Sequence, residues 1–252
     1  MKKFFSIMTV AALALSLVAC EDENKEDNPN NGPDVPDVVA DFDCLKGSDY
    51  YLFVMDAVTS ESIKNKVVAD LRTDDYNTHL WVWENTYLGG TSTGPNFFGE
   101  VEGWVALEVG TVGWSGAAFC TYNPAVLDKL PAITSAPADY VLHLAMKSQD
   151  AAVHELVMYP AGGGEAKVSI GVPGGESPYS FARDGEWHEI EIPMTAFTNN
   201  GLIWNSSQWA GATPGDNVTV IPVGGFNTLA FLSGGFGSVN LDACFIYKPA
   251  KK

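Results

Sequence analysis

The sequence predicts an all-β protein whose strands pack as a β-sandwich or jelly roll. Short runs rich in β-branched and aromatic residues recur between clusters of Gly, Pro and Asn, which is typical of strands joined by tight turns. The 25 Gly and 14 Pro suit many turns, and a hydrophobic content of 46% is enough for a large core. We expect one sandwich domain with two short helical insertions.

The expected strands are β-rich or alternating runs of five to eight residues, at 50–54, 79–83, 104–109, 140–146, 154–159, 167–172, 188–192, 228–232 and 240–247. Two helices interrupt them. Ile63, Val67 and Leu71 recur every four residues, which predicts a helix capped near residues 59–60. The other covers 124–130, because Pro favours the first helical turn and the next Pro stops the helix.

The first nineteen residues have the pattern of a secretory signal. Two lysines precede an apolar stretch, 4–18, that is too short for a confident membrane span. The stretch ends in Leu17-Val18-Ala19-Cys20, which resembles the lipobox of bacterial lipoproteins. That resemblance implies cleavage before Cys20 and its lipidation, and several acyl chains give a stable membrane anchor. The alternative is an ordinary secretory signal with a chance Cys at the cleavage site.

An acidic segment, residues 20–43, follows. Residues 21–43 hold nine acidic residues and one Lys, so we expect a disordered tether that leaves 44–252 as the folded domain. An acidic run after the lipidated Cys resembles the export signal of Bacteroidetes surface lipoproteins, which implies an outer-membrane, lipid-anchored and cell-surface location. The alternative is a solubilising spacer in the periplasm.

The charge of the chain excludes one class of partner. The formal net charge is −17, and the 44–252 domain alone retains −11. A protein this acidic is repelled by phosphate backbones, so nucleic-acid binding is not expected.

The second half carries a family resemblance. Residues 139–147, 184–193 and 240–246 resemble jelly-roll, galactose-binding-like carbohydrate-binding modules, which share a Gly-x-Trp-x-x-hydrophobic-x-Ile-Pro strand and a last strand opening with Leu-Asp. With the lipobox, the chain is similar to surface glycan-binding lipoproteins of Bacteroidetes polysaccharide-utilisation systems. The resemblance implies non-catalytic binding of a polysaccharide or oligosaccharide at the cell surface, beside other proteins of such a system.

Enzyme motifs are weak. Both His-Glu pairs lack the second His of a zinc-protease helix. Gly113–Ala117 approaches a nucleophile elbow but ends in Ala, so we expect a Gly-rich turn at a strand end. Glu189 and Glu191 share one strand face, as a sandwich-fold glycoside hydrolase or lyase could use, although a solvent-facing strand has the same pattern. A structural or adhesive surface lipoprotein is the remaining alternative.

Two tryptophans in a polar loop are the favoured glycan platform. Trp204 and Trp209 lie among Asn, Ser, Gln and Gly, where large aromatics need a function or a cover. Asn205, Gln208 and Arg183 are expected to contact sugar hydroxyl groups. The alternative is that these rings pack against the sandwich edge.

A second platform is expected at Trp81 and Trp83. If Leu80 and Val82 face the core, both rings share the opposite face, beside a His and an Asn. The reversed parity, or a covering insertion, is the alternative. Three further tryptophans are expected in the core: Trp104, Trp114 and Trp187.

The module resemblance also implies a structural Ca²⁺ where the first and last strands meet. Asp242 matches the Leu-Asp position, and Asp41 or Asp43 could approach it from the first strand. No other cofactor is expected.

The same neighbouring strands make a Cys44–Cys244 disulfide a hypothesis, since the chain passes through an oxidising compartment. Closing such a loop could stabilise the fold by up to about 5 kcal/mol. Cys120 is then a buried free thiol, and three free thiols are the alternative.

Overall fold

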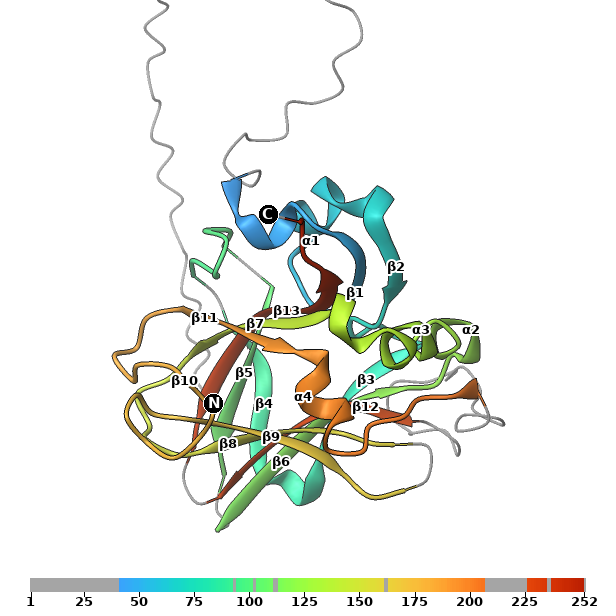
Figure 1. Ribbon diagram of the computed structural model, residues 1–252. Coiled ribbons are helices and arrows are strands. Elements are labelled where there is room, and N and C mark those ends of the chain that lie inside the picture. The colour runs from blue at the N-terminus through green and yellow to red at the C-terminus, as the bar shows by residue number, and fades with distance from the viewer. Residues whose placement is uncertain are drawn as a thin grey trace, which may run out of the picture. The chain divides into compact units, whose positions relative to one another are not determined.

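Two β-sheets packed face to face make up the folded part of the chain (Figure 1). The computed structural model describes residues 41–251, except 93, 102, 111–112, 161–162, 207–225 and 235–236. The predicted all-β sandwich is confirmed. None of the helices within the described ranges has the length and apolar character needed to cross a membrane.

One sheet has seven strands in the described ranges. Five follow the order β11–β7–β13–β1–β2, and β5 also pairs with β13 and carries β4 at its far edge. Their bounds are β1 Ser48–Val54, β2 Val67–Asp70, β4 Tyr87–Ser92, β5 Trp104–Val109, β7 Val141–Lys147, β11 His188–Pro193 and β13 Val239–Lys248.

The other sheet has six described strands in the order β10–β9–β8–β12–β6–β3. Their bounds are β3 Thr78–Val82, β6 Trp114–Thr121, β8 His154–Met158, β9 Ala166–Gly171, β10 Tyr179–Ser180 and β12 Phe226–Gly234. The short helices of the described ranges are α1 Ala57–Ser62, α2 Pro124–Leu127, α3 Pro131–Ser135 and α4 Met194–Thr198, with 3-10 turns η2 Asp43–Leu45, η3 Lys64–Lys66, η4 Trp83–Asn85 and η5 Pro137–Asp139.

The main core lies between the two sheets. Alternate residues of facing strands meet there, for example Leu144 from β7 and Phe119 and Phe231 from the six-stranded sheet, all at most 1% exposed. Burying side chains of this size stabilises the fold by about 1.5–3 kcal/mol each.

The seven-stranded sheet is covered on its outer face as well. A second apolar cluster there combines Leu45 of η2, Ile63 after α1 and Phe98 with Tyr50 of β1 and Phe245 of β13. This sheet is therefore buried on both faces, whereas the outer face of the six-stranded sheet has only a small cluster of its own within the described residues.

The predicted helix at 63–71 is wrong. The helix here is α1, where the Asp56 carboxylate accepts a hydrogen bond from the Thr59 backbone N–H at 2.7 Å, and it ends before Ile63. Val67 instead opens β2, which pairs in parallel with β1. The four-residue spacing arose from a turn followed by a strand.

The second predicted helix is two helices. Pro124 and Pro131 each stand in a first turn, so Pro131 begins α3 instead of only ending α2. The Gly113–Ala117 turn is also wrong, because β6 runs through it from Trp114.

The Cys44–Cys244 disulfide does not form. Cys44, Cys120 and Cys244 are free and buried. Cys44 belongs to the outer cluster and Cys244 to the core between the sheets, so the seven-stranded sheet separates their side chains. Burial raises the pKa of the Cys44 thiol to about 12, which leaves it protonated and unreactive.

Buried His154 makes the stability of the fold sensitive to acid. Its side chain is 1% exposed, its Nε2 has no hydrogen-bond partner, and burial together with the charge of Arg183 lowers its pKa to about 4. The unfolded chain, with an ordinary His pKa of about 6.5, takes up the proton first as the pH falls. The stability that the neutral His154 contributes is therefore complete above about pH 6.5. It falls progressively between about pH 6.5 and 4, and it is fully lost below about pH 4.

We expect the free energy of unfolding to fall by up to about 3 kcal/mol between pH 7 and 4 on account of His154. His154→Phe should remove this part while folding normally at pH 7. Urea unfolding of both proteins across this pH range measures it, and parallel pH profiles would contradict the assignment.

Candidate functional site

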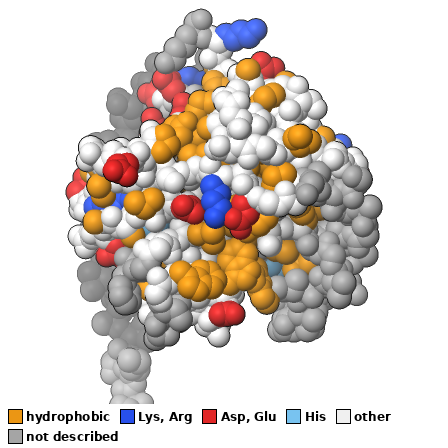
Figure 2. All heavy atoms as spheres, turned by 60° about the horizontal axis from the view of Figure 1, so that its bottom comes forward, with side chains coloured by type: hydrophobic (Ala, Val, Ile, Leu, Met, Phe, Trp, Pro, Cys, Tyr) orange, Lys and Arg blue, Asp and Glu red, His pale blue; other side chains and the backbone are white. Residues whose placement is uncertain are grey.

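Two exposed tryptophans lie on the outer face of the six-stranded sheet. Trp81 of β3 is 40% exposed and Trp114 of β6 is 45% exposed. The strand register sets Trp81 opposite Ala118 and Trp114 opposite Gly234. Figure 2 brings this side of the molecule forward and shows hydrophobic side chains gathered in its middle.

The orientation predicted for β3 is confirmed. Leu80 and Val82 pack against the main core, which turns Trp81 outward. Trp83 follows on the same side and packs, half-buried, against the small outer cluster formed by Ala118, Val157 and Ala230. The parity of one strand thus places both rings on one surface.

Gly116 lets three large side chains converge. A Cβ built at this position would lie 2.6 Å from the Trp83 ring and 2.9 Å from both Leu232 and the Trp114 ring. Real Cβ atoms do not approach other atoms so closely, so any larger residue would push these side chains apart. The missing side chain at Gly116 is what permits a continuous apolar surface here.

A strained turn holds Trp83 in this position. Glu84 and Asn85 both have positive φ, +48° and +55°, a region that costs non-Gly residues about 1–3 kcal/mol each. Thr86 fastens the turn to β6, because its hydroxyl accepts a hydrogen bond from the Gly116 N–H at 3.0 Å. Ser115 donates in return to the Thr86 carbonyl.

Polar groups adjoin the aromatic surface. Trp114, Val153, Glu155 and Leu232 line one shallow hollow. Lys167 of β9 contacts both Glu165, at 2.7 Å, and Glu155, at 3.6 Å. The face therefore combines flat apolar rings with hydrogen-bonding side chains, which is the arrangement of an orienting ligand site.

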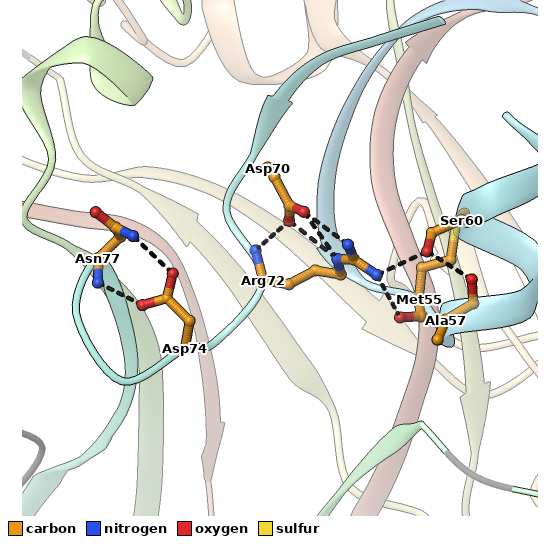
Figure 3. Close-up of polar contacts among 7 residues, drawn as sticks. All are labelled: Met55, Ala57, Ser60, Asp70, Arg72, Asp74 and Asn77. Atoms are coloured by element: carbon orange, nitrogen blue, oxygen red, sulfur yellow. Dashed lines mark hydrogen bonds and ion pairs between the residues drawn. The ribbon is translucent and has the colours of Figure 1, made fainter. Parts of the chain in front are cut away.

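A larger cleft of about 870 Å³ opens on the side of the sandwich beside β2, and several of its charged and polar side chains form hydrogen bonds within the fold. Arg72 donates to the Asp70 carboxylate, to the Met55 carbonyl and to the Ser60 hydroxyl (Figure 3). These bonds join the chain after β2 to α1. They are structural, and the cleft offers no exposed ring, since Trp104 in it is 6% exposed.

The loop that follows Arg72 is closed by Asp74. Its carboxylate accepts from the Tyr76 N–H. It also accepts from the Asn77 N–H and from the Asn77 side-chain amide (Figure 3). These hydrogen bonds lower the pKa of Asp74 against the opposing effect of burial. Asp74 therefore fixes the entry into β3.

Trp204 is a core residue, contrary to the prediction. It is 2% exposed and packs in the main core, and its indole N–H donates to the Tyr159 carbonyl at 3.1 Å. Leu202, also buried, and exposed Ile203 alternate with it, so an extended segment with two inward side chains explains the pattern. The alternative of rings packed on the sandwich holds for Trp204.

Arg183 also has a structural role. It donates to the backbone carbonyls of Asp150, Phe181 and Ala152 at 2.8–3.2 Å and stacks on the Phe181 ring. Three of its five N–H donors are therefore engaged within the fold. Asn205 is exposed, while Gln208 and Trp209 lie outside the described residues and stay predictions.

Glu189 and Glu191 lie on the other sheet. Glu189 is 3.5 Å from buried His143, whose hydrogen bond lowers the carboxyl pKa. Glu191 accepts the Tyr247 hydroxyl at 2.6 Å. A general acid needs a raised pKa, so Glu189 is not in the environment of a glycosidase's acid.

The predicted calcium pair is not formed as expected. Asp43 is 87% exposed and pairs with Lys46, whereas Asp242 is fully buried. The bulge at Ala243, with φ +45°, turns Asp242 to the outer cluster, where its Oδ2 accepts from the Phe97 N–H at 2.8 Å. Burial raises the pKa of Asp242 to about 6.

Sequence reasoning missed Trp114 and Gly116 as parts of the site. Trp104 is buried as expected, and Trp187 is half-buried against it at a ring distance of 5.7 Å, but Trp114 is exposed. The available signal was alternation in Trp114-Ser115-Gly116-Ala117-Ala118-Phe119, where Ala117 and Phe119 face the core. The glycines at 113 and 116 made this segment resemble a turn, so the strand was not predicted.

Neither a protein-family model nor a curated protein sequence matches the chain. Among solved structures it is similar to an exo-β-agarase (12% identity, TM-score 0.40), covering 70% of this chain and 23% of that one. It is similar to the family 11 carbohydrate-binding module of a Clostridium thermocellum cellulosomal cellulase (14%, TM-score 0.36; 70% and 90%). It is also similar to the module TmCBM61, solved with β-1,4-galactotriose, at 11% identity and a TM-score of 0.34, covering 68% of this chain and 88% of that one. Values this low leave the function to be argued from the site itself.

Replacing Trp204 by Ala should destabilise the protein. Removing a fully buried Trp leaves a cavity and deletes its hydrogen bond to the Tyr159 carbonyl, so we expect a loss of about 3–5 kcal/mol. Trp81→Ala, at an exposed position, should cost under about 1 kcal/mol. Denaturant unfolding compares the two, and equal losses would contradict this division between core and surface.

Proposed function

We propose that the protein is a non-catalytic carbohydrate-binding protein and that a glycan stacks on the outer face of the six-stranded sheet. The observation that carries the proposal is the convergence of Trp83, Trp114 and Leu232 over Gly116, with Trp81 exposed beside them. Sugar rings present apolar C–H faces that flat aromatic rings cover. The adjoining Glu155 and Lys167 would then hold the hydroxyl groups.

The proposal assigns no catalytic role to the side chains of this face. Glu155 and Glu165 are both joined to Lys167 and are about 41% exposed, so neither is in the desolvated setting that makes a carboxylic acid a proton donor at neutral pH. Glu189 and Glu191 are engaged on the other sheet.

We propose that the domain acts at the outer surface of the outer membrane. The support is the lipobox ending in Cys20 and the acidic segment after it. Acyl chains on Cys20 would hold the protein in the membrane, and the acidic segment would let the domain reach polysaccharide beside other proteins of a utilisation system.

The aromatic face is tested by removing its exposed rings. We expect Trp81→Ala and Trp114→Ala each to weaken glycan affinity about 30-fold, because a stacked anchor is worth about 2 kcal/mol, with little change in melting temperature. Affinity electrophoresis against a polysaccharide panel, followed by calorimetry on the best ligand, measures the effect.

Tyr76→Ala is the matched control, since Tyr76 is 58% exposed in the loop before β3. It should leave affinity unchanged. Unaltered binding in both Trp variants would place the site elsewhere, and a large drop in melting temperature would assign those rings to the core.

We further propose that a structural Ca²⁺ binds beside Asp242. The fully buried Oδ1 of Asp242 has no hydrogen-bond partner, which is the state of a carboxylate oxygen that lacks a cation or a proton. Asp56, 6% exposed, acts electrostatically on it and is the second carboxylate that could contribute. Three His, Cys, Asp or Glu side chains do not gather anywhere in the described ranges, so backbone carbonyls would have to supply the remaining ligands.

Added Ca²⁺ should raise the melting temperature after EDTA treatment, since a ligand that binds only the folded state stabilises it. Asp242→Asn should abolish that rise. Differential scanning fluorimetry at pH 7 measures it, and identical melting curves with EDTA and Ca²⁺ would contradict the calcium site.

A further inference from the structure

Three charged side chains stand together at the edge of the aromatic face. The Lys167 ammonium lies 2.7 Å from Glu165 Oε2 and 3.6 Å from Glu155 Oε2, and all three side chains are about 41% exposed. We call them the charged triad. Figure 2 shows a basic side chain between two acidic ones directly beside the hydrophobic patch. The triad is therefore solvent-accessible and has a net charge of −1.

The strand register connects the triad to the tryptophans. One row of paired residues crosses the face from Trp81 through Ala118, Ala230 and Val157 to Lys167. Strands lie about 4.8 Å apart, so this row spans about 19 Å. Its middle residues are buried, and the partly exposed side chains of Trp83, Tyr159 and Leu232 pack against them, so apolar side chains continue from Trp81 towards the triad.

A second row brings Glu155 to the same place. Glu155 pairs with Leu232, which pairs with Gly116, and Glu155 lines the same hollow as Trp114. A glycan that stacks on either exposed Trp and extends across the strands therefore reaches the triad.

The charges on this face do not suit an anion. Lys167 is the basic residue in these two rows, and both of its acidic neighbours compete for it; its hydrogen bond to Glu165 raises its pKa and keeps it charged. A carboxylate or sulfate on the ligand would have to displace a Glu and would face the other at close range. The net charge of −11 on residues 44–252 adds a general repulsion.

We infer that the face selects neutral glycans and rejects those bearing uronate or sulfate groups, with the charged triad as the element that discriminates. This inference rests on the proposed function. Neutral sugars offer hydroxyl groups, which can donate to the Glu oxygens and accept from the Lys167 ammonium without breaking the triad. The carboxylate or sulfate group of an acidic sugar offers only further acceptors to the two Glu carboxylates.

The test uses polysaccharide pairs that differ mainly in charge: hydroxyethyl- and carboxymethyl-cellulose, and dextran and dextran sulfate. We expect the purified full chain to bind at least one neutral member at low salt, with loss in Trp81→Ala, and to bind no acidic member. Trp81-dependent binding of an acidic member at equal or higher affinity would overturn the inference and leave the proposed function standing. Absence of binding to these probes and to a broad glycan array would overturn both.

A second variant tests the triad itself. Glu155→Gln with Glu165→Gln leaves Lys167 uncompensated, and we expect about a tenfold gain in affinity for the acidic partner of the bound neutral glycan, lost again at about 0.5 M salt. The control is Asp43→Asn with Glu61→Gln, which changes the net charge equally at η2 and α1. An equal gain in the control, or no gain in the triad variant, would overturn the role of the triad.

Discussion

The absence of a side chain at Gly116 is the constraint on which the proposed binding face depends. Trp83, Leu232 and Trp114 come from three strands or their ends, and they meet above this one position. The strained turn at Glu84 and Asn85 positions Trp83, and the ring can pack there only because Gly116 has no side chain. Because protein interiors and faces pack closely, the space left by Gly116 is filled by the three large side chains, which thereby form a single surface.

The two sheets solve the same burial problem differently. The seven-stranded sheet hides its outer face beneath η2, α1 and the segment around Phe97 and Phe98, so its polar groups, His143 and Asp242, are enclosed. The six-stranded sheet keeps two large rings in contact with water. The exposed rings are the basis of the proposed interaction site, while the covered face serves stability.

Sequence patterns predicted the sandwich and nine of its strands because alternation and β-rich runs report burial directly. β1, β5 and β11 fall within a residue or two of their expected bounds. The Trp81 and Trp83 orientation followed from the same parity. Trp204 was wrongly predicted to be exposed because its polar neighbours indicate a surface loop. They give no information on which side chains of an extended segment point inward. The bulge at Ala243 decides on which side of the sheet Cys244 lies, and therefore that the sheet separates it from Cys44. A bulge interrupts the alternation of a strand and cannot be recognised from the sequence pattern.

The position of β13 has a consequence for how the protein folds. This strand pairs with β7 on one side and with β1 and β5 in succession on the other, and it is the last of the described strands. Ser48 meets Lys248, so the central pairing joins the two ends of the folded chain. Until β13 pairs, one edge each of β1, β5 and β7 stays open, and because these pairings span a long stretch of sequence they make folding slow. The chain needs protection from association through those open edges until β13 is in place.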